Sequence, residues 1–176
     1  MKLWKTILIP TLSLFVICLV VAGALAGSNA ITARKIEELN RRNTEALMKQ
    51  VLPAEAYEEV SAEGGTVYRA SSGGAAAGYV IVTAAKGYGG DVQVMTGFDE
   101  TGAITNIDIV ACDDETPGLG QRVKERAFLD QFVGKTEKTV LKTDVDAITG
   151  ATISSTAVNQ AVNDARSIWE QMEGGE

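Results

Sequence analysis

The hydrophobic and polar positions divide the chain into stretches of different character, and the first is strongly apolar. Residues 7–26 form an uninterrupted run without a charged side chain. A helix rises 1.5 Å per residue, so this run of about 20 residues measures about 30 Å, the thickness of the hydrocarbon core of a bilayer. The pattern therefore predicts one transmembrane helix. Pro10 lies in its first turn, where a missing N–H costs little.

After the apolar run, hydrophobic residues recur at helical spacing from residue 31 to residue 51, with charged residues between them. This pattern predicts an amphipathic helix that continues from the membrane span as a stalk and ends before Pro53. Residues 54–65 are expected to form a connecting loop or a short turn of helix. The expected organisation is an anchor at 1–28, a stalk and connector at 29–60, and one folded domain at 61–176.

The domain alternates between strand-like and helix-like segments. Val, Ile, Tyr and Thr are frequent at 66–70, 78–84, 91–98 and 103–111, which predicts four strands. Residues 71–77 are read as a surface loop, and the turn at 99–102 makes the last two strands an antiparallel hairpin. Helices are predicted at 121–132 and 154–172, with a strand at 139–144. The predicted class is α+β, an antiparallel sheet flanked by helices and preceded by one N-terminal transmembrane helix.

A cleaved signal peptide is the alternative reading of the N-terminus. Lys2 and Lys5 form a short positive region, and the sequence Ala-Leu-Ala at 24–26 is similar to a cleavage site. We expect an uncleaved anchor. Gly23 and Gly27 are four residues apart, a spacing that allows close approach of another helix in the membrane.

The composition excludes several classes of function. The chain has 176 residues, a formal net charge of −7 and no histidine. An acidic chain is an improbable partner for nucleic acid. The absence of histidine excludes a Ser-His-Asp triad and removes the commonest ligand of zinc, so we expect neither hydrolysis nor a resident metal.

With only Cys18 in the span and Cys112 in the domain, an iron–sulfur cluster has too few ligands. We expect Cys112 to be a core residue at a strand end. A bound organic cofactor can still supply redox chemistry.

The sequence Asp-Ala-Ile-Thr-Gly-Ala-Thr at 146–152 is the strongest candidate for a cofactor site. Thr149, Gly150 and Ala151 are small, so a bulky group can lie against the backbone. Ser154 or Ser155 is a suitable N-cap for the closing helix. Thr152 is then expected just ahead of a helix N-terminus, which favours an anion by about 0.3–1 kcal/mol when exposed. On spacing alone, an ordinary turn before a capped core helix explains the same residues.

Two further motifs precede it. The loop Glu-Thr-Pro-Gly-Leu-Gly at 115–120 contains Pro117, which fixes its own φ, and glycines that permit tight bends with amides turned toward a ligand. The segment Lys-Gly-Tyr-Gly-Gly at 86–90 places Tyr88 among glycines. Tyr88 either packs near a ligand or belongs to a hairpin turn.

In this order, the three motifs resemble those of the FMN-binding domain family. In that family a dedicated Mg-dependent transferase takes FMN from FAD and esterifies its phosphate to the final Thr of the signature. The resemblance implies an FMN covalently attached through a phosphoester to Thr152, with the Mg belonging to the transferase and not to this chain. It implies that Asp146 helps to position the motif for the transferase. The remaining residues expected to bind the cofactor are Tyr88, Glu115, Thr116, Gly118, Leu119, Gly120, Thr149, Gly150, Ala151, Ser154 and Ser155.

Within the family, the length and layout are most similar to those of the small membrane-anchored flavoprotein subunit of the Rnf ferredoxin:NAD oxidoreductase complex. The resemblance implies an electron carrier without independent catalysis. Its expected partners are the other membrane subunits of such an ion-translocating complex, the flavin transferase and membrane lipid. It also implies a single-pass protein of the cell membrane with its flavin domain on the extracytoplasmic side, although the basic residues at 34–42 favour the cytoplasm by charge count.

Other functions fit parts of the pattern. The equivalent subunit of the Na-translocating NADH:quinone reductase is a longer chain and ranks second. A free-standing membrane-anchored flavoprotein for extracytoplasmic electron transfer, and an extracytoplasmic binding domain without flavin, are the remaining alternatives.

Overall fold

The chain divides into two compact units, Met1–Asn43 and Thr44–Glu176. The long N-terminal helix α1 (Lys2–Val51) begins in the first unit and ends in the second. The computed structural model describes residues 2–173, and the side chains of residues 11–27 and 43–172 within them.

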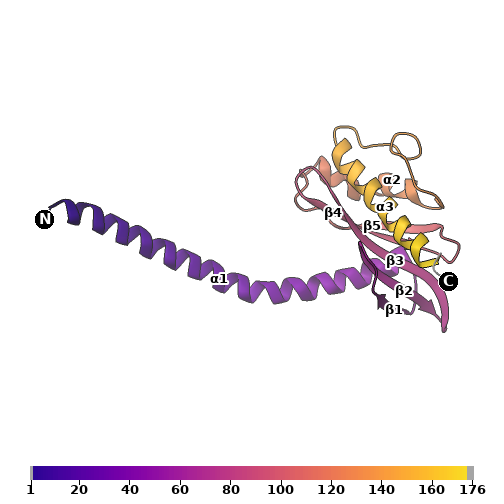
Figure 1. Cartoon of the computed structure of the whole chain (residues 1–176), viewed down its shortest axis with the longest axis horizontal. Helices are drawn as coiled ribbons and strands as arrows, with labels where there is room; N and C mark the ends of the chain where they lie inside the picture. Colours follow the sequence, from indigo (N-terminus) through magenta and orange to yellow (C-terminus); the bar gives the residue numbers. More distant parts are fainter. Residues whose placement is uncertain (1, 174–176) are drawn as a thin grey trace. The chain divides into compact units, whose positions relative to one another are not determined.

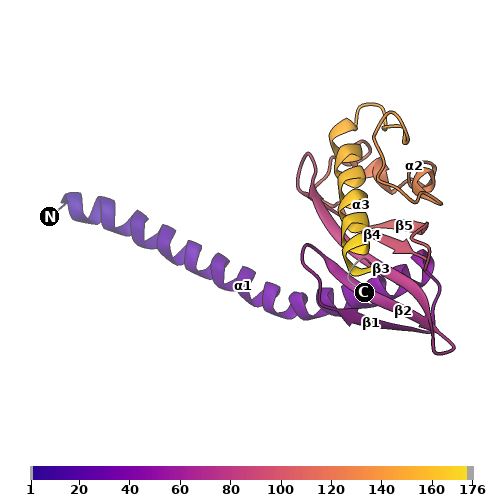
Figure 2. The ribbon, with the colours of Figure 1, turned by 45° about the vertical axis from the view of Figure 1, so that its right-hand side comes forward.

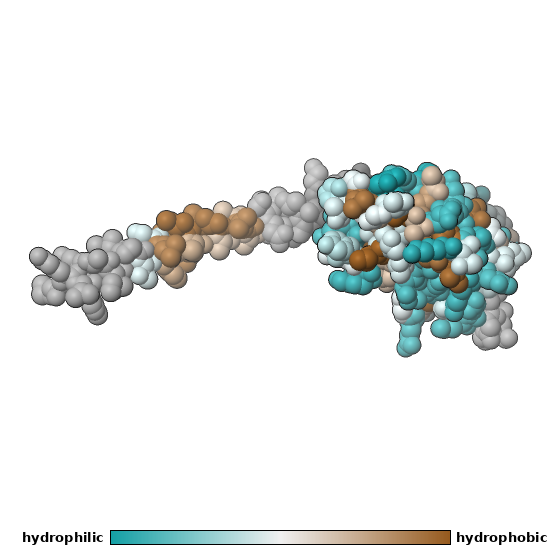
Figure 3. All heavy atoms as spheres, turned by 90° about the horizontal axis from the view of Figure 1, so that it is seen from above, coloured by the Kyte–Doolittle hydropathy of each residue, from teal (hydrophilic) through white to brown (hydrophobic). Residues whose placement is uncertain are grey.

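In the first unit, the described side chains of α1 at 11–27 are mostly apolar, and all of them are exposed. Figure 3 shows one face of this stretch, in brown. None of the helices, over the residues that the structure describes, combines the length and hydropathy of a membrane span. Residues 7–10 of the predicted span, and residues 31–42 of the predicted stalk, lie outside the described side chains. The transmembrane helix therefore stays a prediction.

The second unit is built on a five-stranded antiparallel sheet in which each strand pairs with the next along the chain (Figure 1). Its strands are β1 (Ala56–Val60), β2 (Thr66–Ser72), β3 (Ala75–Lys86), β4 (Asp91–Phe98) and β5 (Ile104–Ala111). The predicted α+β class and its antiparallel sheet are confirmed, and each of the four predicted strands is present. The hairpin between β4 and β5 is also confirmed. Its turn is held by Asp99, whose Oδ1 accepts hydrogen bonds from the N–H groups of Thr101 and Ala103.

Two expectations for the first half of the domain were wrong. Residues 54–65 do not form a loop only, because β1 lies within them as an edge strand. Its acidic residues Glu58 and Glu59 have low strand propensity, whereas Tyr57 anchors the strand through a hydrogen bond from its hydroxyl to the Leu52 carbonyl, at 2.7 Å. Residues 71–77 are mostly strand, because β2 and β3 meet at a turn of two glycines, Gly73 and Gly74, with φ of 60° and 81°.

Two expectations for the second half were wrong as well. Residues 121–132 form no continuous helix but three short pieces, η1 (Gly120–Lys124), α2 (Arg126–Leu129) and η2 (Asp130–Phe132). Glu125 is extended between the first two, with φ −66° and ψ 130°, and the changes of direction let Val123, Phe128 and Phe132 all reach the core.

The predicted strand at 139–144 is absent. The backbone of Thr139 pairs with side chains of the closing helix, and residues 140–144 bond among themselves and with Val145. The Thr139 N–H donates to Asn163 Oδ1 at 2.8 Å, and the Thr139 carbonyl accepts from Asn159 Nδ2 and Asn163 Nδ2 at 3.1 and 2.9 Å. Two asparagines one helical turn apart therefore hold the segment that leads to the 146–152 motif.

The closing helix α3 (Thr152–Glu173) covers one face of the sheet (Figures 1 and 2). It begins two residues earlier than predicted. Its buried positions recur at three- and four-residue steps and pack mainly on β3 and β4. On the opposite face, Met48, Val51 and Leu52 at the end of α1 pack on Ala70, Val80 and Met95. Cys112 is buried directly after β5, as expected.

The asparagine contacts predict a specific loss of stability. Asn163→Ala removes the hydrogen bonds to both backbone groups of Thr139, so we expect the free energy of unfolding to fall by about 1–3 kcal/mol, measured by urea denaturation. Gln160→Ala is the matched control on the same helix, because Gln160 is exposed and makes only a 3.5 Å contact with Asp164. We expect the control to change stability by less than about 0.5 kcal/mol. Equal effects of the two substitutions would contradict this role of Asn163.

Candidate functional site

The start of α3 is set by a tight turn. The Ala151 N–H donates to the Ile148 carbonyl at 3.0 Å, and Gly150 between them has φ 81°, a conformation that favours glycine. The Ser155 N–H then donates to the Ala151 carbonyl at 2.9 Å. Ala151 is therefore the residue that precedes the helix, and Thr152 is its first helical residue. The expectation that Ser154 or Ser155 caps the helix was wrong, since both lie inside its first turn.

Thr152, Ile153 and Ser154 have no carbonyl of the helix four residues before them to pair with. Their N–H groups point out of the helix start and form a site suited to an anion. The Thr152 side chain is exposed.

Ser155 holds the turn from behind. It is fully buried, its hydroxyl donates to the Ala151 carbonyl at 2.9 Å, and it accepts from the Ile148 N–H at 3.1 Å. Both ends of the turn are thus bonded to one side chain. Ser155 contributes to the site by fixing Gly150 and Ala151.

Glu115 comes from the loop after β5 and lies beneath the first turn of α3. Only 1% of its surface is exposed. Its Oε2 accepts a hydrogen bond from the Ser154 hydroxyl, and its Oε1 accepts one from the Gly89 N–H at 3.1 Å. Burial alone raises the pKa of Glu115, but the hydrogen bonds from Ser154 and from the N–H groups of residues 88–90 outweigh it and hold the pKa below its ordinary value. The carboxylate is therefore ionised at neutral pH.

The glycines of the two upstream motifs make room for this carboxylate. A Cβ on Gly87 would lie 2.3 Å from Glu115 Oε1, and a Cβ on Gly120 would lie 2.6 Å from Glu115 Oε2. Gly118 does not contact the carboxylate but lies in a turn. With Pro117 it forms a turn closed by the Leu119 N–H and the Thr116 carbonyl at 3.2 Å, in which Gly118 has φ 74°.

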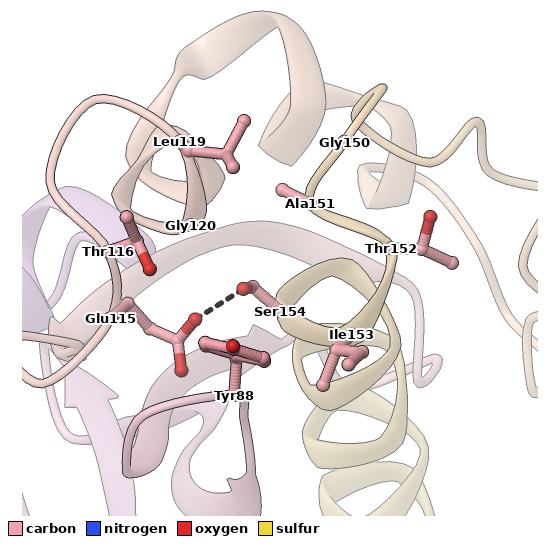
Figure 4. Close-up of a pocket in the computed structure, with 10 residues that line it drawn as sticks. All are labelled: Tyr88, Glu115, Thr116, Leu119, Gly120, Gly150, Ala151, Thr152, Ile153 and Ser154. Carbon is pink, nitrogen blue, oxygen red and sulfur yellow. Dashed lines mark hydrogen bonds between the residues drawn. The ribbon is translucent and has the colours of Figure 1, made fainter.

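These segments surround a hollow of about 410 Å³, within the usual range of small-molecule sites. Figure 4 shows Glu115 and Ser154 facing each other, with Thr116 and Leu119 beside them on the loop after β5. The Thr152 side chain points away from that pair. Tyr88, Leu119 and Ile153 are 71%, 41% and 53% exposed and give the hollow an apolar rim.

The structure brings most of the predicted site residues together around this hollow, which is lined by Tyr88, Glu115, Thr116, Leu119, Gly120, Gly150, Ala151, Thr152, Ile153 and Ser154. Ile153 was missed by sequence reasoning. Placing the helix start at Thr152 would have found it, because Ile153 then belongs to the exposed first turn.

Four predicted residues lie elsewhere. Gly118 and Ser155 hold the two turns on either side of the hollow. Asp146 and Thr149 line a separate, smaller hollow, where the Asp146 N–H donates to Gln131 Oε1 at 2.7 Å. The first four residues of the signature, 146–149, therefore line the smaller hollow, and Gly150, Ala151 and Thr152 line the larger one.

The donor set of the larger hollow fits FMN attached through its phosphate. Backbone N–H groups at a helix start suit a phosphate with one negative charge, and the apolar rim suits a flat aromatic ring. Its lining contains no lysine or arginine, and Glu115 is its one charged side chain.

Known proteins resemble this chain over most of its length. Residues 87–167 match the family model of the FMN-binding domain. The chain is 36% identical to the G subunit of the Na(+)-translocating ferredoxin:NAD(+) oxidoreductase complex of Acetobacterium woodii, over 96% of this chain and 94% of that protein. It is 33% identical to the G subunit of the ion-translocating oxidoreductase complex of Methanosarcina acetivorans, over 92% and 94% of the two chains. The crystal structure of Shewanella oneidensis NqrC has the same fold, with a TM-score of 0.52 and 16% identity over 73% of this chain and 74% of that chain.

The chain belongs to the FMN-binding domain family, among the G subunits of ion-translocating oxidoreductase complexes. The family resemblance inferred from the three motifs is thereby confirmed. The part that each site residue plays stays a prediction.

The lowered pKa of Glu115 predicts a pH-dependent contribution to stability. A carboxylate with a depressed pKa in the folded chain stabilises it fully above the unfolded pKa of about 4.3, and the contribution is lost as pH falls through the folded value. We expect Glu115→Gln to lower the free energy of unfolding of the unmodified chain by about 1.5–3 kcal/mol at pH 7. In urea denaturation the gap to wild type should shrink below about pH 4. A gap that stays constant down to pH 3 would contradict the ionised carboxylate.

Proposed function

We propose that the protein is a membrane-anchored electron-transfer subunit that carries FMN in phosphoester linkage to Thr152, within an ion-translocating ferredoxin:NAD oxidoreductase complex. One observation carries the proposal. Thr152 is the first residue of α3, so its exposed hydroxyl lies beside the unpaired N–H groups of the helix start, at the edge of the 410 Å³ hollow.

The bound FMN supplies the electron-transfer chemistry. The residues of the chain position it. The N–H groups of Thr152, Ile153 and Ser154 receive the phosphate, and the turn at Gly150 leaves no side chain in its way. Ser155 fixes this turn, and the Pro117–Gly118 turn presents Thr116 and Leu119 to the ring.

The charges of the hollow favour a covalent tether over reversible binding. Free FMN is a phosphate monoester with a second pKa near 6, so at pH 7 it carries close to two negative charges. The lining offers no cation to pair with them, and an exposed helix N-terminus contributes only about 0.3–1 kcal/mol. Esterification to Thr152 removes one of these charges and holds the cofactor without an ion pair.

The orientation of Thr152 suits modification by another enzyme. Its side chain points away from the buried Glu115–Ser154 pair (Figure 4) and is exposed, so a flavin transferase can reach the hydroxyl without opening the domain. The rim residues Tyr88, Leu119 and Ile153 are also exposed. A ring placed against them keeps an accessible edge for electron exchange with a partner subunit.

The hollow holds little else that does chemistry. Glu115 is its one titratable carboxyl, and both of its oxygens already accept hydrogen bonds from Ser154 and Gly89. The proposal therefore assigns the chain a relay of electrons and no turnover of a substrate on its own.

The assembly is proposed from the relatives and from α1. Two relatives that match more than nine-tenths of this chain are G subunits of ion-translocating oxidoreductase complexes. The described apolar side chains of α1 at 11–27 face solvent on all sides, which suits a lipid environment. We propose that this helix is a single-pass anchor in the cell membrane, that Gly23 and Gly27 face a helix of another subunit, and that the flavin domain lies on the extracytoplasmic side.

The attachment site has a direct test. In chain expressed together with its flavin transferase, we expect a fluorescent flavin band on a denaturing gel and the mass of one esterified FMN on the peptide that holds Thr152. Thr152→Ala removes the acceptor oxygen and should abolish both. Thr156→Ala is the matched control, because Thr156 is an exposed threonine one turn further along the same helix. Flavin retained by the Thr152 variant would contradict the assignment.

The anchor is tested by extraction. We expect the full chain to stay with the membrane fraction in an alkaline carbonate wash, because an apolar helix of this length resists removal. A variant lacking residues 1–28 should appear in the soluble fraction. Release of the full chain by the wash would contradict a spanning helix.

A further inference from the structure

We propose that Glu115 is a positioning residue of the flavin site, whose buried negative charge opposes reduction of the attached FMN and so lowers its midpoint potential. The inference rests on the proposed function, because it concerns the cofactor that this function requires. Nothing in the electron-relay role itself demands a buried carboxylate at this place.

Glu115 connects the segments that form the hollow. It lies in the loop after β5, accepts a hydrogen bond from Ser154 in the first turn of α3, and accepts another from Gly89 in the turn between β3 and β4. These segments are distant in sequence, and the Ser154 bond joins residues 39 positions apart. One side chain thus sets the position of the helix start relative to both glycine-containing loops.

The backbone around Glu115 is shaped for a carboxylate. Gly87 and Gly120 lack the Cβ atoms that would collide with its two oxygens. Gly89 and Gly90 lie close to Asp114: a Cβ on Gly89 would be 1.8 Å from the Asp114 carbonyl oxygen, and a Cβ on Gly90 would be 2.5 Å from the Asp114 Cβ. The glycines at 87–90 are therefore packed against the loop that carries Glu115.

The charge of Glu115 is close to the cofactor and poorly screened. It is the one charged side chain that lines the hollow, and it is 1% exposed. Each electron that the flavin accepts from its redox partner adds negative charge to the site unless a proton follows. A fixed carboxylate in a medium of low dielectric opposes that addition, whereas exposed charges nearby are screened by water and salt.

The hydrogen bond from Ser154 to Glu115 also limits what Ser154 can offer a ligand. Its hydroxyl proton is directed to Glu115, so toward the hollow Ser154 presents lone pairs and not a donor. Recognition of the phosphate is then left to the backbone N–H groups. Ser154 and Glu115 have separable effects, since one carries the charge and the other only a hydrogen bond.

The test is the midpoint potential of the covalently bound FMN in the full-length, flavinylated chain, measured by spectroelectrochemical titration at pH 8. We expect Glu115→Gln, which keeps the shape and removes the charge, to shift the potential to more positive values. Asp113→Asn is the matched control. It removes an equal charge two residues away, from a side chain that is 88% exposed, and we expect no shift. Equal potentials for Glu115→Gln and wild type would overturn the inference.

A second variant keeps the inference testable if Glu115→Gln does not retain its cofactor. Ser154→Ala leaves the carboxylate in place and removes a donor that partly neutralises it, so its potential should stay unchanged or become more negative. A positive shift in this variant would overturn the inference. Wild-type chain that carries no covalent FMN would contradict the proposed function itself, whereas flavinylated wild type with a potential indifferent to Glu115 would contradict only the inference.

Discussion

The structure depends on where α3 begins. The turn from Ile148 to Ala151, closed through Gly150 and held by the buried Ser155 hydroxyl, makes Thr152 the first helical residue. If the helix began at Ser154, as a simple capping rule suggests, Thr152 would lie in the preceding turn, two residues before the helix start. With the observed start, an exposed hydroxyl and a row of unpaired amides come from consecutive residues. The rest of the domain supports this arrangement, since α3 is packed along the sheet and cannot slide without uncovering the core.

Beneath that helix start, a buried carboxylate organises the remaining walls of the site. A buried charge is costly unless it is hydrogen-bonded, and Glu115 receives its bonds from Ser154 and from the glycine turn after β3. The glycine-containing motifs of this domain are therefore explained by the residue that they enclose as much as by any ligand. The side chains at the rim of the hollow, Tyr88, Leu119 and Ile153, stay exposed.

Much of the fold could be predicted from the sequence, for reasons visible in particular residues. The abundance of Val, Ile, Tyr and Thr located β2 to β5, and the three-and-four spacing of apolar residues located α3. The Glu-Thr-Pro-Gly-Leu-Gly loop and the 146–152 signature located the site. The predictions that were wrong concern segments whose structure is decided by tertiary contacts. β1 is acidic and is a strand because it pairs with β2. Residues 139–144 form no strand, because Asn159 and Asn163 bond to the backbone of Thr139 and the residues after it bond locally. The neighbours of Glu115 and the separation of Asp146 from the larger hollow also lie outside what local sequence can specify.

We propose that the cofactor is held as a phosphodiester on Thr152, and phosphorus NMR of the purified flavinylated protein distinguishes this linkage from bound free FMN. A phosphodiester has no second ionisation, whereas a phosphate monoester titrates near pH 6. We expect a single phosphorus resonance whose position does not change between about pH 5 and pH 8. A resonance that moves with pH through that range would show free or reversibly bound FMN and would contradict the linkage to Thr152.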